Sequence, residues 1–285
     1  MAKKKTSVRN RLHAEPGVVN LDGYDTAATT GSAGTKAEAQ AELTKSTGPK
    51  LAALQERLYA AAAGTGDQRR VLLVLQGMDT SGKGGVIEHV VGQLGPAGVT
   101  VTSFKKPTAQ ELAHHFLWRI RRGLPAAGQV GVFDRSHYED VLVVRVHGGI
   151  DDAEAERRFD EINAFEAGLA TEGTTVIKCF LHISFAEQRN RLLARLEDPT
   201  KHWKFREGDI TERGLWPDYG KAYAQVLART STDAAPWYVV PADQKWYRNW
   251  AISHLLLETL TDLDPQFPAT DFDVPGLVAR LQPPH

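Results

Sequence analysis

Hydrophobic residues in this chain gather in short strand-like segments, separated by longer segments with helical spacing. The segment 71–76 (VLLVLQ) is a continuous apolar run, typical of a strand buried on both faces of a parallel sheet. We predict four further strands at 99–104, 129–134, 174–183 and 237–242.

The segments between these predicted strands carry the spacing of amphipathic helices. Leu51, Leu54 and Leu58 share one helical face, and Thr108 is followed three residues later by Glu111, as in a capping box. Strands that alternate with helices form parallel βαβ units. The pattern predicts an α/β fold with a mostly parallel, five-stranded, doubly wound sheet and helices over 36–63, 83–94, 108–122, 137–146, 152–170 and 244–262.

Three segments depart from this alternation. Residues 1–35 are basic and then rich in Thr, Gly and Ala, which predicts an irregular N-terminal arm. Residues 263–285 form a Pro-rich tail. A charged, aromatic insert interrupts the rhythm near 197–218, and we take about 189–231 as a helical lid segment. The core domain is predicted to span 36–262.

Composition narrows the class of protein. The chain has 285 residues, 42% of them hydrophobic, and a formal net charge of −1, which gives a nucleic-acid-binding role no general support. Its one cysteine, Cys179, lies in a predicted strand, and this fits a reducing compartment. No apolar run is long enough to span a membrane, and no apolar stretch follows the basic start. We expect a cytoplasmic protein with no membrane partner.

The stretch "LQGMDTSGKGGVI" (75–87) closely matches a phosphate-binding loop. Gly77, Gly82 and Lys83 fit the pattern G-x-x-x-x-G-K, and the loop follows a predicted strand and opens a predicted helix. Backbone N–H groups in such a loop converge on phosphate oxygens, and the lysine supplies a cation for the group being transferred. The predicted phosphate- and nucleotide-binding residues here are Gly77, Thr80, Ser81, Gly82, Lys83, Gly84 and Gly85.

The usual Ser or Thr after the lysine is replaced by Gly84, which cannot ligate a cation. Asp79 lies inside the loop, and Asp134 ends the segment 129–134, at the sheet edge where ligands of α/β proteins gather. Mg²⁺ is often held by one or two carboxylates together with phosphates and water. We predict that Asp79 and Asp134 hold Mg²⁺, or Mn²⁺ in its place. A turn-forming role is the alternative for Asp79.

Arg135 follows Asp134 directly, where a guanidinium can hold a phosphate. The alternative is a salt bridge from Arg135 to Glu139 or Asp140. Glu139 is also a candidate for nucleotide binding.

Two basic patches lie outside the loop. Lys105 and Lys106 follow a predicted strand and should reach the same sheet edge as the loop. The second patch, "RNRLLARLEDPTKHWKFR" (189–206), lies where a kinase places its lid, and such a lid brings arginines onto phosphates. A surface insert with ordinary packing aromatics is the alternative. The candidates in this second patch are Arg191, Arg195, Lys204 and Arg206.

Four stretches together resemble the polyphosphate kinase 2 family in its single-domain form. They are "LQGMDTSGKGG", "FDRSHYEDVLVVRVHG", "RLLARLEDPTKHWKF" and "APWYVVPADQKWYRNW", and the resemblance runs from about 21 to 260. It implies a P-loop kinase fold similar to thymidylate kinase, with a lid. It also implies Mg²⁺-dependent phosphoryl transfer between inorganic polyphosphate and a nucleotide (AMP, ADP or ATP).

The resemblance also implies roles for residues. Asp79 and Asp134 would hold Mg²⁺, while Lys83 and Arg135 would stabilise the transferred charge. "FDRSHYEDVLVV" departs from the form "FNRSHYEDVLVV", and its continuation resembles members that accept both AMP and ADP. A dimer or tetramer of this chain is expected, with no nucleic-acid partner. From charge alone, we expect Lys105, Lys106, Lys204 and Arg206 to line a polyphosphate track.

Two other functions fit parts of the pattern. One is an ATP-dependent nucleotide or small-molecule kinase on the same fold. The other is a non-catalytic P-loop protein that binds RNA or polyphosphate through the basic patch. The combined presence of Asp79, Lys83 and Asp134 argues against the second, and the cations outside the loop favour a long polyanion over a single triphosphate.

Overall fold

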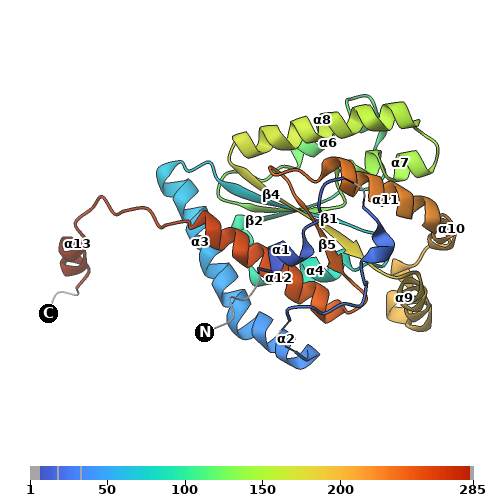
Figure 1. Ribbon diagram of the computed structural model, residues 1–285. Helices are drawn as coiled ribbons and strands as arrows, with labels where there is room; N and C mark the ends of the chain where they lie inside the picture. Colours follow the sequence, from blue (N-terminus) through green and yellow to red (C-terminus); the bar gives the residue numbers. More distant parts are fainter. Residues whose placement is uncertain (1–6, 18, 33, 283–285) are drawn as a thin grey trace.

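A single parallel sheet forms the centre of the molecule. The computed structural model describes residues 7–17, 19–32 and 34–282. Its five strands lie in the order β2-β3-β1-β4-β5 and all pair in parallel (Figure 1). This confirms the predicted α/β sheet of a P-loop kinase. The strands are β1 (Arg70–Gln76), β2 (Val99–Ser103), β3 (Val130–Asp134), β4 (Thr174–His182) and β5 (Trp237–Pro241).

Helices cover both faces of this sheet, which explains the unbroken hydrophobic run of β1. In β1, Leu73 and Leu75 point to the face covered by α3 (Gly48–Thr65) and α12 (Lys245–Leu263). Leu72 and Val74 point to the opposite face, covered by α8 (Asp152–Thr171) and α11 (Trp216–Thr230) (Figure 1). All four of these side chains are fully buried. An alternating pattern would have placed polar groups in one of the two cores.

The predicted helix 36–63 forms with an interruption. It consists of α2 (Lys36–Glu42), a π-helical turn η2 (Leu43–Thr47) and α3. Pro49, in the first turn of α3, has no N–H to continue the i→i−4 ladder, so the hydrogen-bonding pattern changes just before it.

Several other predicted helices are shorter than expected. The segment 83–94 becomes α4 (Lys83–His89) followed by the 3₁₀ turn η3 (Val91–Gln93), and a further 3₁₀ turn, η4 (Pro96–Gly98), precedes β2. The segment 108–122 splits into α5 (Ala109–Leu112), with the predicted Thr108–Glu111 capping box, and α6 (Leu117–Arg122). Leu112 is exposed, whereas Leu117 and Ile120 are buried, so only the second half packs on the core.

The predicted helix 137–146 also divides, into the 3₁₀ turn η5 (His137–Asp140) and α7 (Val143–Val146). The lid segment, by contrast, is largely helical, as predicted. It contains most of α9 (Phe185–Glu197), the 3₁₀ turn η6 (Pro199–Lys204), α10 (Gly208–Gly214) and α11. Both regions connect to the carboxyl edge of the sheet.

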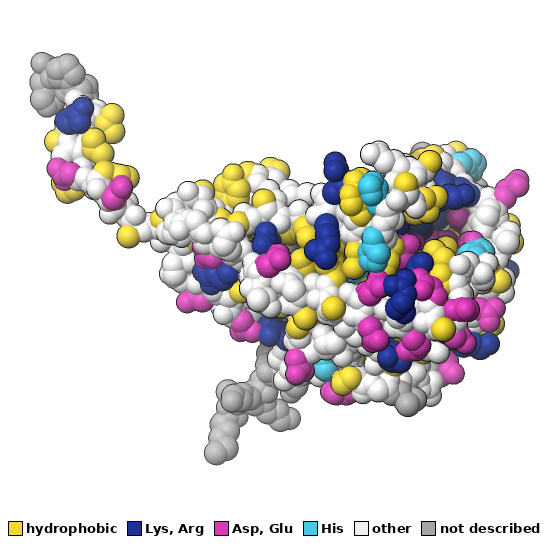
Figure 2. Space-filling model, turned by 90° about the horizontal axis from the view of Figure 1, so that it is seen from above, with side chains coloured by type: hydrophobic (Ala, Val, Ile, Leu, Met, Phe, Trp, Pro, Cys, Tyr) yellow, Lys and Arg dark blue, Asp and Glu magenta, His cyan; other side chains and the backbone are white. Residues whose placement is uncertain are grey.

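Both ends of the chain contain helices that the sequence pattern did not predict. In the N-terminal arm, α1 (Val8–Leu12) buries Val8 and Leu12 beside α12, and Glu258 of α12 accepts the backbone N–H groups of Val8 and Arg9. A 3₁₀ turn, η1 (Leu21–Gly23), follows. The tail carries α13 (Val274–Leu281) at the end of an extended segment that projects from the body (Figures 1 and 2). No helix in the described part of the chain combines the length and apolar character needed to cross a membrane.

Candidate active site

The predicted phosphate-binding loop connects β1 to α4 at the carboxyl edge of the sheet, in the predicted strand–loop–helix arrangement. Gly82 has φ +105°, a conformation that side chains rarely adopt. A β-carbon at Gly82 would also lie 1.6 Å from Nη1 of Arg248. Both the backbone angle and the close packing therefore require glycine here. Thr80 also has a positive φ, of +64°.

Lys83 lies at the centre of the charged groups. Its Nζ donates to the carbonyl oxygen of Gly77 at 2.7 Å. Burial lowers the pKa of Lys83, as does the nearby charge of Arg135, while the carboxylates of Asp79, Asp134 and Glu139 raise it. The ammonium is thus within electrostatic reach of all four residues, as a role in phosphoryl transfer requires.

Asp134 is the last residue of β3, and Ser103 at the end of β2 donates its hydroxyl to Asp134 Oδ2 at 3.4 Å. Arg135 follows with φ +65°, and its N–H donates to the carbonyl of Leu75 at 3.0 Å. This left-handed turn brings the Arg135 side chain over the phosphate-binding loop, where its Nη2 lies 3.3 Å from Asp79 Oδ1.

The ion pair considered as an alternative for Arg135 is also present, since Nη1 lies 3.8 Å from Glu139 Oε2. The Arg135 side chain is nevertheless 41% exposed, so a phosphate can reach it. Gln76 donates to Glu139 Oε1 at 3.0 Å. Burial raises the pKa of Glu139, and Arg135 and Gln76 oppose that shift. Arg135 and Glu139 thus form one charged wall of the site.

A divalent metal is implied by the loop, and the available oxygens fit Mg²⁺. Asp79 is 31% exposed, and both Asp79 and Asp134 act electrostatically on Lys83. Within the described residues, no group of three or more His, Cys, Asp and Glu side chains is arranged to hold a metal. Two carboxylates with the remaining positions left to phosphates and water suit Mg²⁺ or Mn²⁺ better than a soft metal that needs nitrogen or sulfur ligands.

Arg191, predicted to lie in the lid, instead supports the back of the loop in this structure. Its side chain is 7% exposed, and Nη1 donates to the carbonyl of Thr80 at 2.9 Å. Nη2 donates to the carbonyl of Ala242 at 2.6 Å, and Nε to Glu187 Oε1 at 2.8 Å. These bonds connect α9, the loop and the end of β5, a role that the sequence pattern did not predict.

Arg248 of α12 is a second buried support, and sequence reasoning missed it. It is 2% exposed, and its Nη1 donates to the carbonyl of Ser81 at 3.2 Å. Asn249 Oδ1 accepts from its Nε and Nη2. Burial and the neighbouring Arg191 lower the pKa of Arg248 to about 10. One feature of the sequence could have indicated this role: Arg248 lies among the aromatic residues of "KWYRNW", on a helix expected to be buried.

Within the described part of the chain, the remaining basic candidates form no hydrogen bond or ion pair with the loop. Arg195 donates to the carbonyl of Lys204 at 2.9 Å and pairs with Asp209 at 3.5 Å, so it connects parts of the lid segment. On the face shown in Figure 2, basic and acidic side chains are interspersed. The predicted track residues are all exposed: Lys105, Lys106, Lys204 and Arg206.

A cavity of about 190 Å³ opens beside the loop. One wall consists of charged and loop residues already described, and the other is contributed by α7, α9, α10 and α11. This second wall is rich in aromatic side chains, which sequence reasoning missed because nothing in their local spacing distinguishes them from core residues. Tyr219 donates its hydroxyl to Glu212 Oε2 at 2.6 Å. The second wall is formed by Val143, Gln188, Glu212, Trp216, Tyr219 and Tyr223.

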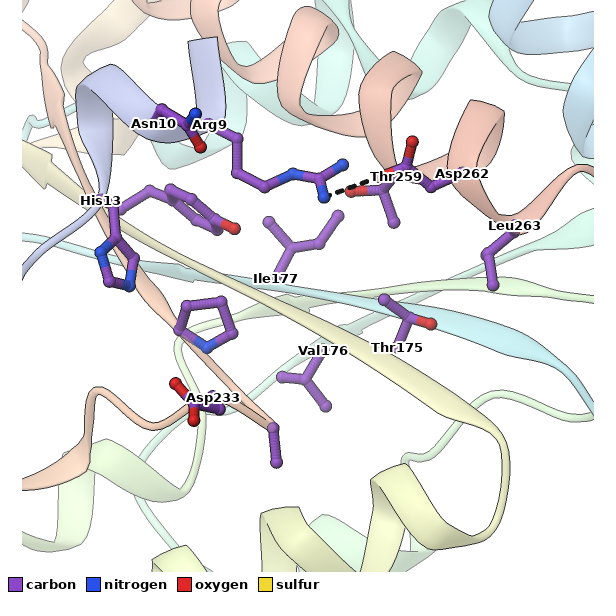
Figure 3. A pocket seen from close by; sticks show the side chains of 13 residues that line it. Arg9, Asn10, His13, Thr175, Val176, Ile177, Asp233, Thr259, Asp262 and Leu263 are labelled. Carbon is purple, nitrogen blue, oxygen red and sulfur yellow. Dashed lines mark ion pairs between the residues drawn. The ribbon is translucent and has the colours of Figure 1, made fainter. Parts of the chain in front are cut away.

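A larger cavity, of about 480 Å³, lies elsewhere (Figure 3). Thr175 and Tyr238 line it near the amino ends of β4 and β5, at the sheet edge opposite the loop. Arg9 and Asp262 form an ion pair of 2.8 Å across it. Because this cavity has no phosphate-binding loop, we assign the chemistry to the smaller one.

Comparisons with known proteins agree with this geometry. The family model described as polyphosphate kinase 2 matches residues 34–268. The AMP/ADP-polyphosphate phosphotransferase of Meiothermus ruber is 49% identical over 248 residues, which cover 87% of this chain and 90% of that protein. The ADP-polyphosphate phosphotransferase of Rhodopseudomonas palustris is 43% identical over 241 residues, which cover 80% of this chain and 82% of that protein. A crystal structure of polyphosphate kinase 2 from Arthrobacter aurescens matches with a TM-score of 0.94 and 49% identity, over 98% of each chain.

Proposed function

Because this chain belongs to the polyphosphate kinase 2 family, we propose that it transfers phosphoryl groups between inorganic polyphosphate and AMP or ADP with the help of Mg²⁺. The observation that carries the proposal is the placement of Lys83, Arg135 and the two aspartates around one glycine-rich loop. Relatives that match most of this chain are named for reactions of this kind.

The charged groups suit the demands of phosphoryl transfer. Negative charge is spread over the equatorial oxygens of the group in transfer, so catalysis depends on positioned cations and N–H donors. Lys83 and Arg135 supply the cations, and the backbone N–H groups of the loop hold the phosphates. Asp79 and Asp134 would hold Mg²⁺, which supplies further neutralisation of phosphate charge when bound. Arg191 and Arg248 keep the loop in shape from behind.

We propose the aromatic cavity as the site of the nucleotide. Trp216, Tyr219 and Tyr223 offer an apolar surface of the kind that nucleosides pack against, and the same cavity reaches Asp79 and Arg135. We propose that the acceptor enters with its phosphates toward Arg135 and its nucleoside toward the aromatic side chains. This orientation would place the acceptor phosphate next to the transferred group.

The polyphosphate donor needs a line of cations, and we propose that Lys105, Lys106, Lys204 and Arg206 contribute to it. An exposed electrostatic track is screened by salt, so the KM for polyphosphate should rise with ionic strength. Lys106→Ala should raise this KM at low salt and reduce its slope with salt, while the nucleotide KM changes less. Lys221→Ala is a matched control, because Lys221 lies on the side of α11 opposite Tyr219 and Tyr223 and is 78% exposed. A polyphosphate KM unaffected by both salt and Lys106→Ala would refute the track.

The decisive experiment uses purified protein, Mg²⁺, polyphosphate and either ADP or AMP, with no added ATP. Formation of the nucleotide with one more phosphate supports the proposed function. If polyphosphate gives no product while ATP serves as donor, the proposed function is wrong and the protein is an ATP-dependent kinase. We also propose a homo-oligomer, a dimer or tetramer, which light scattering coupled to size-exclusion chromatography tests directly.

A further inference from the structure

A buried ionic cluster lies on the face of the sheet covered by α8 and α11. Lys178 of β4 is fully buried, and Glu166 of α8 is 1% exposed. Lys178 Nζ donates to Glu166 Oε2 at 2.5 Å, to the Tyr138 hydroxyl at 2.8 Å and to the carbonyl of Thr230 at 2.6 Å. All three hydrogens of the ammonium therefore have acceptors.

Glu166 connects this cluster to the segment that follows the catalytic residues. Its Oε1 accepts from the Tyr138 hydroxyl at 2.9 Å and from His137 Nε2 at 3.1 Å. His137 Nδ1 is buried and has no partner in the described structure, so the bond to Glu166 fixes the ring through Nε2. Burial would raise the pKa of Glu166, but Lys178 and His137 together lower it, which keeps the carboxylate ionised as an acceptor.

His137 and Tyr138 lie three and four residues after Asp134. The chain turns sharply between Asp134 and His137, because Arg135 has φ +65° and Ser136 is extended. A left-handed backbone at a non-glycine residue costs free energy and persists only where surrounding contacts impose it. The two side chains held by Glu166 are such contacts, since they fix the chain immediately beyond the turn.

The cluster also crosses the sheet. Strands β3 and β4 are not neighbours, since β1 lies between them, and Val74 of β1 pairs with both Phe133 and Lys178. The bond from Lys178 Nζ to the Tyr138 hydroxyl thus connects β4 to the turn that follows β3, across the strand that carries the phosphate-binding loop. The bond from Lys178 Nζ to the Thr230 carbonyl also connects the cluster to the end of α11, the helix that carries Tyr219 and Tyr223.

We propose that the Glu166–Lys178 pair is a positioning device for phosphoryl transfer, which fixes His137 and Tyr138 and through them the orientation of Asp134 and Arg135. This inference rests on the proposed function of the same site. Stability alone does not require the cluster, because well-packed apolar residues often replace a buried ion pair without loss. His137 and Tyr138, which donate to Glu166, lie only three and four residues after Asp134. The position of these two bonds favours a role in orienting the site.

The test compares two small substitutions in the same cluster. Tyr138→Phe keeps the ring that packs on Trp237 at 4.8 Å between centroids but removes the hydroxyl shared by Lys178 and Glu166. Thr230→Val is the matched control. It removes the 2.9 Å bond from Trp237 Nε1 but keeps the backbone carbonyl that Lys178 uses, and it leaves both bonds to Glu166 Oε1 in place.

A misplaced catalytic group is costly, so we expect Tyr138→Phe to lower kcat by about tenfold or more and to raise the Mg²⁺ concentration for half-maximal rate. Calorimetry should show that Mg²⁺ strengthens ADP binding less than in the wild type, and hydrogen exchange should be faster across 134–140. Thr230→Val should lose about as much Tm as Tyr138→Phe. It should nevertheless keep kcat, the Mg²⁺ dependence, the effect of Mg²⁺ on ADP binding and the hydrogen-exchange rates near wild type. His137→Phe, which removes the other bond to Glu166, serves if Tyr138→Phe does not fold.

The proposal is overturned if folded Tyr138→Phe keeps kcat and Mg²⁺ dependence within about twofold of wild type, a margin below one kcal/mol. It is equally overturned if Thr230→Val changes them as much. If the wild type does not use polyphosphate, the proposed function fails, while calorimetry and hydrogen exchange still decide whether the cluster orients the segment.

Discussion

Replacing Lys83 by Met removes the ammonium at the centre of the site and keeps most of the side-chain length. Nζ lies 2.7 Å from the Gly77 carbonyl and within electrostatic reach of Asp79, Asp134 and Arg135. Loss of one oriented charge-stabilising group typically costs about 10²- to 10³-fold in kcat, or about 2.7–4 kcal/mol. We expect Lys83→Met to fall in this range.

The same change should not destabilise the protein. Burial lowers the pKa of Lys83 below its ordinary value of 10.5, so the folded state binds this proton less tightly than the unfolded chain does. Stability attributable to Lys83 therefore rises with pH between the folded and unfolded pKa values, and below both values the partly buried ammonium opposes folding. At neutral pH the Met variant should keep or gain Tm. In the wild type, kcat should decline as Lys83 loses its proton, beginning below pH 10.5.

The assay measures kcat at saturating polyphosphate, ADP and Mg²⁺, with Tm recorded for the same samples. Lys221→Met, an exposed substitution on α11, controls for loss of a lysine as such. A Lys83→Met variant with more than about a tenth of wild-type kcat would remove Lys83 from the mechanism, since even the smaller cost above exceeds tenfold. A large fall in Tm would instead assign the lost activity to folding.

Two further predictions concern the loop. Asp79→Asn and Asp134→Asn should each raise the Mg²⁺ concentration needed for half-maximal rate, with non-additive effects in the double variant, and a titration of Asp79→Asn that overlays wild type would contradict a shared site. Gly82→Ala should lower both Tm and kcat, because its β-carbon meets the buried Arg248, whereas Gly84→Ala faces open space and should keep its Tm. Equal Tm values for these two alanine variants would refute the packing argument.

The sequence predicted the strands and the loop well because local physics determines both. Four strands, β1, β3, β4 and β5, are mostly buried, whereas the edge strand β2 is not, and the loop carries its glycines and lysine at fixed spacing. Helix boundaries were less predictable. The segment 137–146 divides because His137 and Tyr138 enter the core, and such tertiary packing overrides helical periodicity.

The roles of individual arginines could not be predicted for a related reason. Arg191 has the same lid-like sequence context as Arg195, yet it reaches the Thr80 carbonyl, 111 residues away in the chain. Arg248 reaches Ser81 over 167 residues. The spacing of residues within a short segment gives no information about contacts this distant in sequence. Asp79, Lys83 and Asp134 were recognisable because the topology of a parallel sheet brings strand ends and the following loops to one edge.

The strand order has a consequence for how the protein is made. β1 is the first strand to leave the ribosome, but its neighbours are β3 and β4, so residue 71 pairs with residues 130 and 175. Until β4 has been synthesised, the most hydrophobic strand of the chain has an unpaired edge. Contacts this distant in sequence are also slow to form, because a large loop must close before any of them is gained. The strand that carries the phosphate-binding loop is therefore the part of the nascent chain most exposed to aggregation, and the catalytic edge is completed late in synthesis.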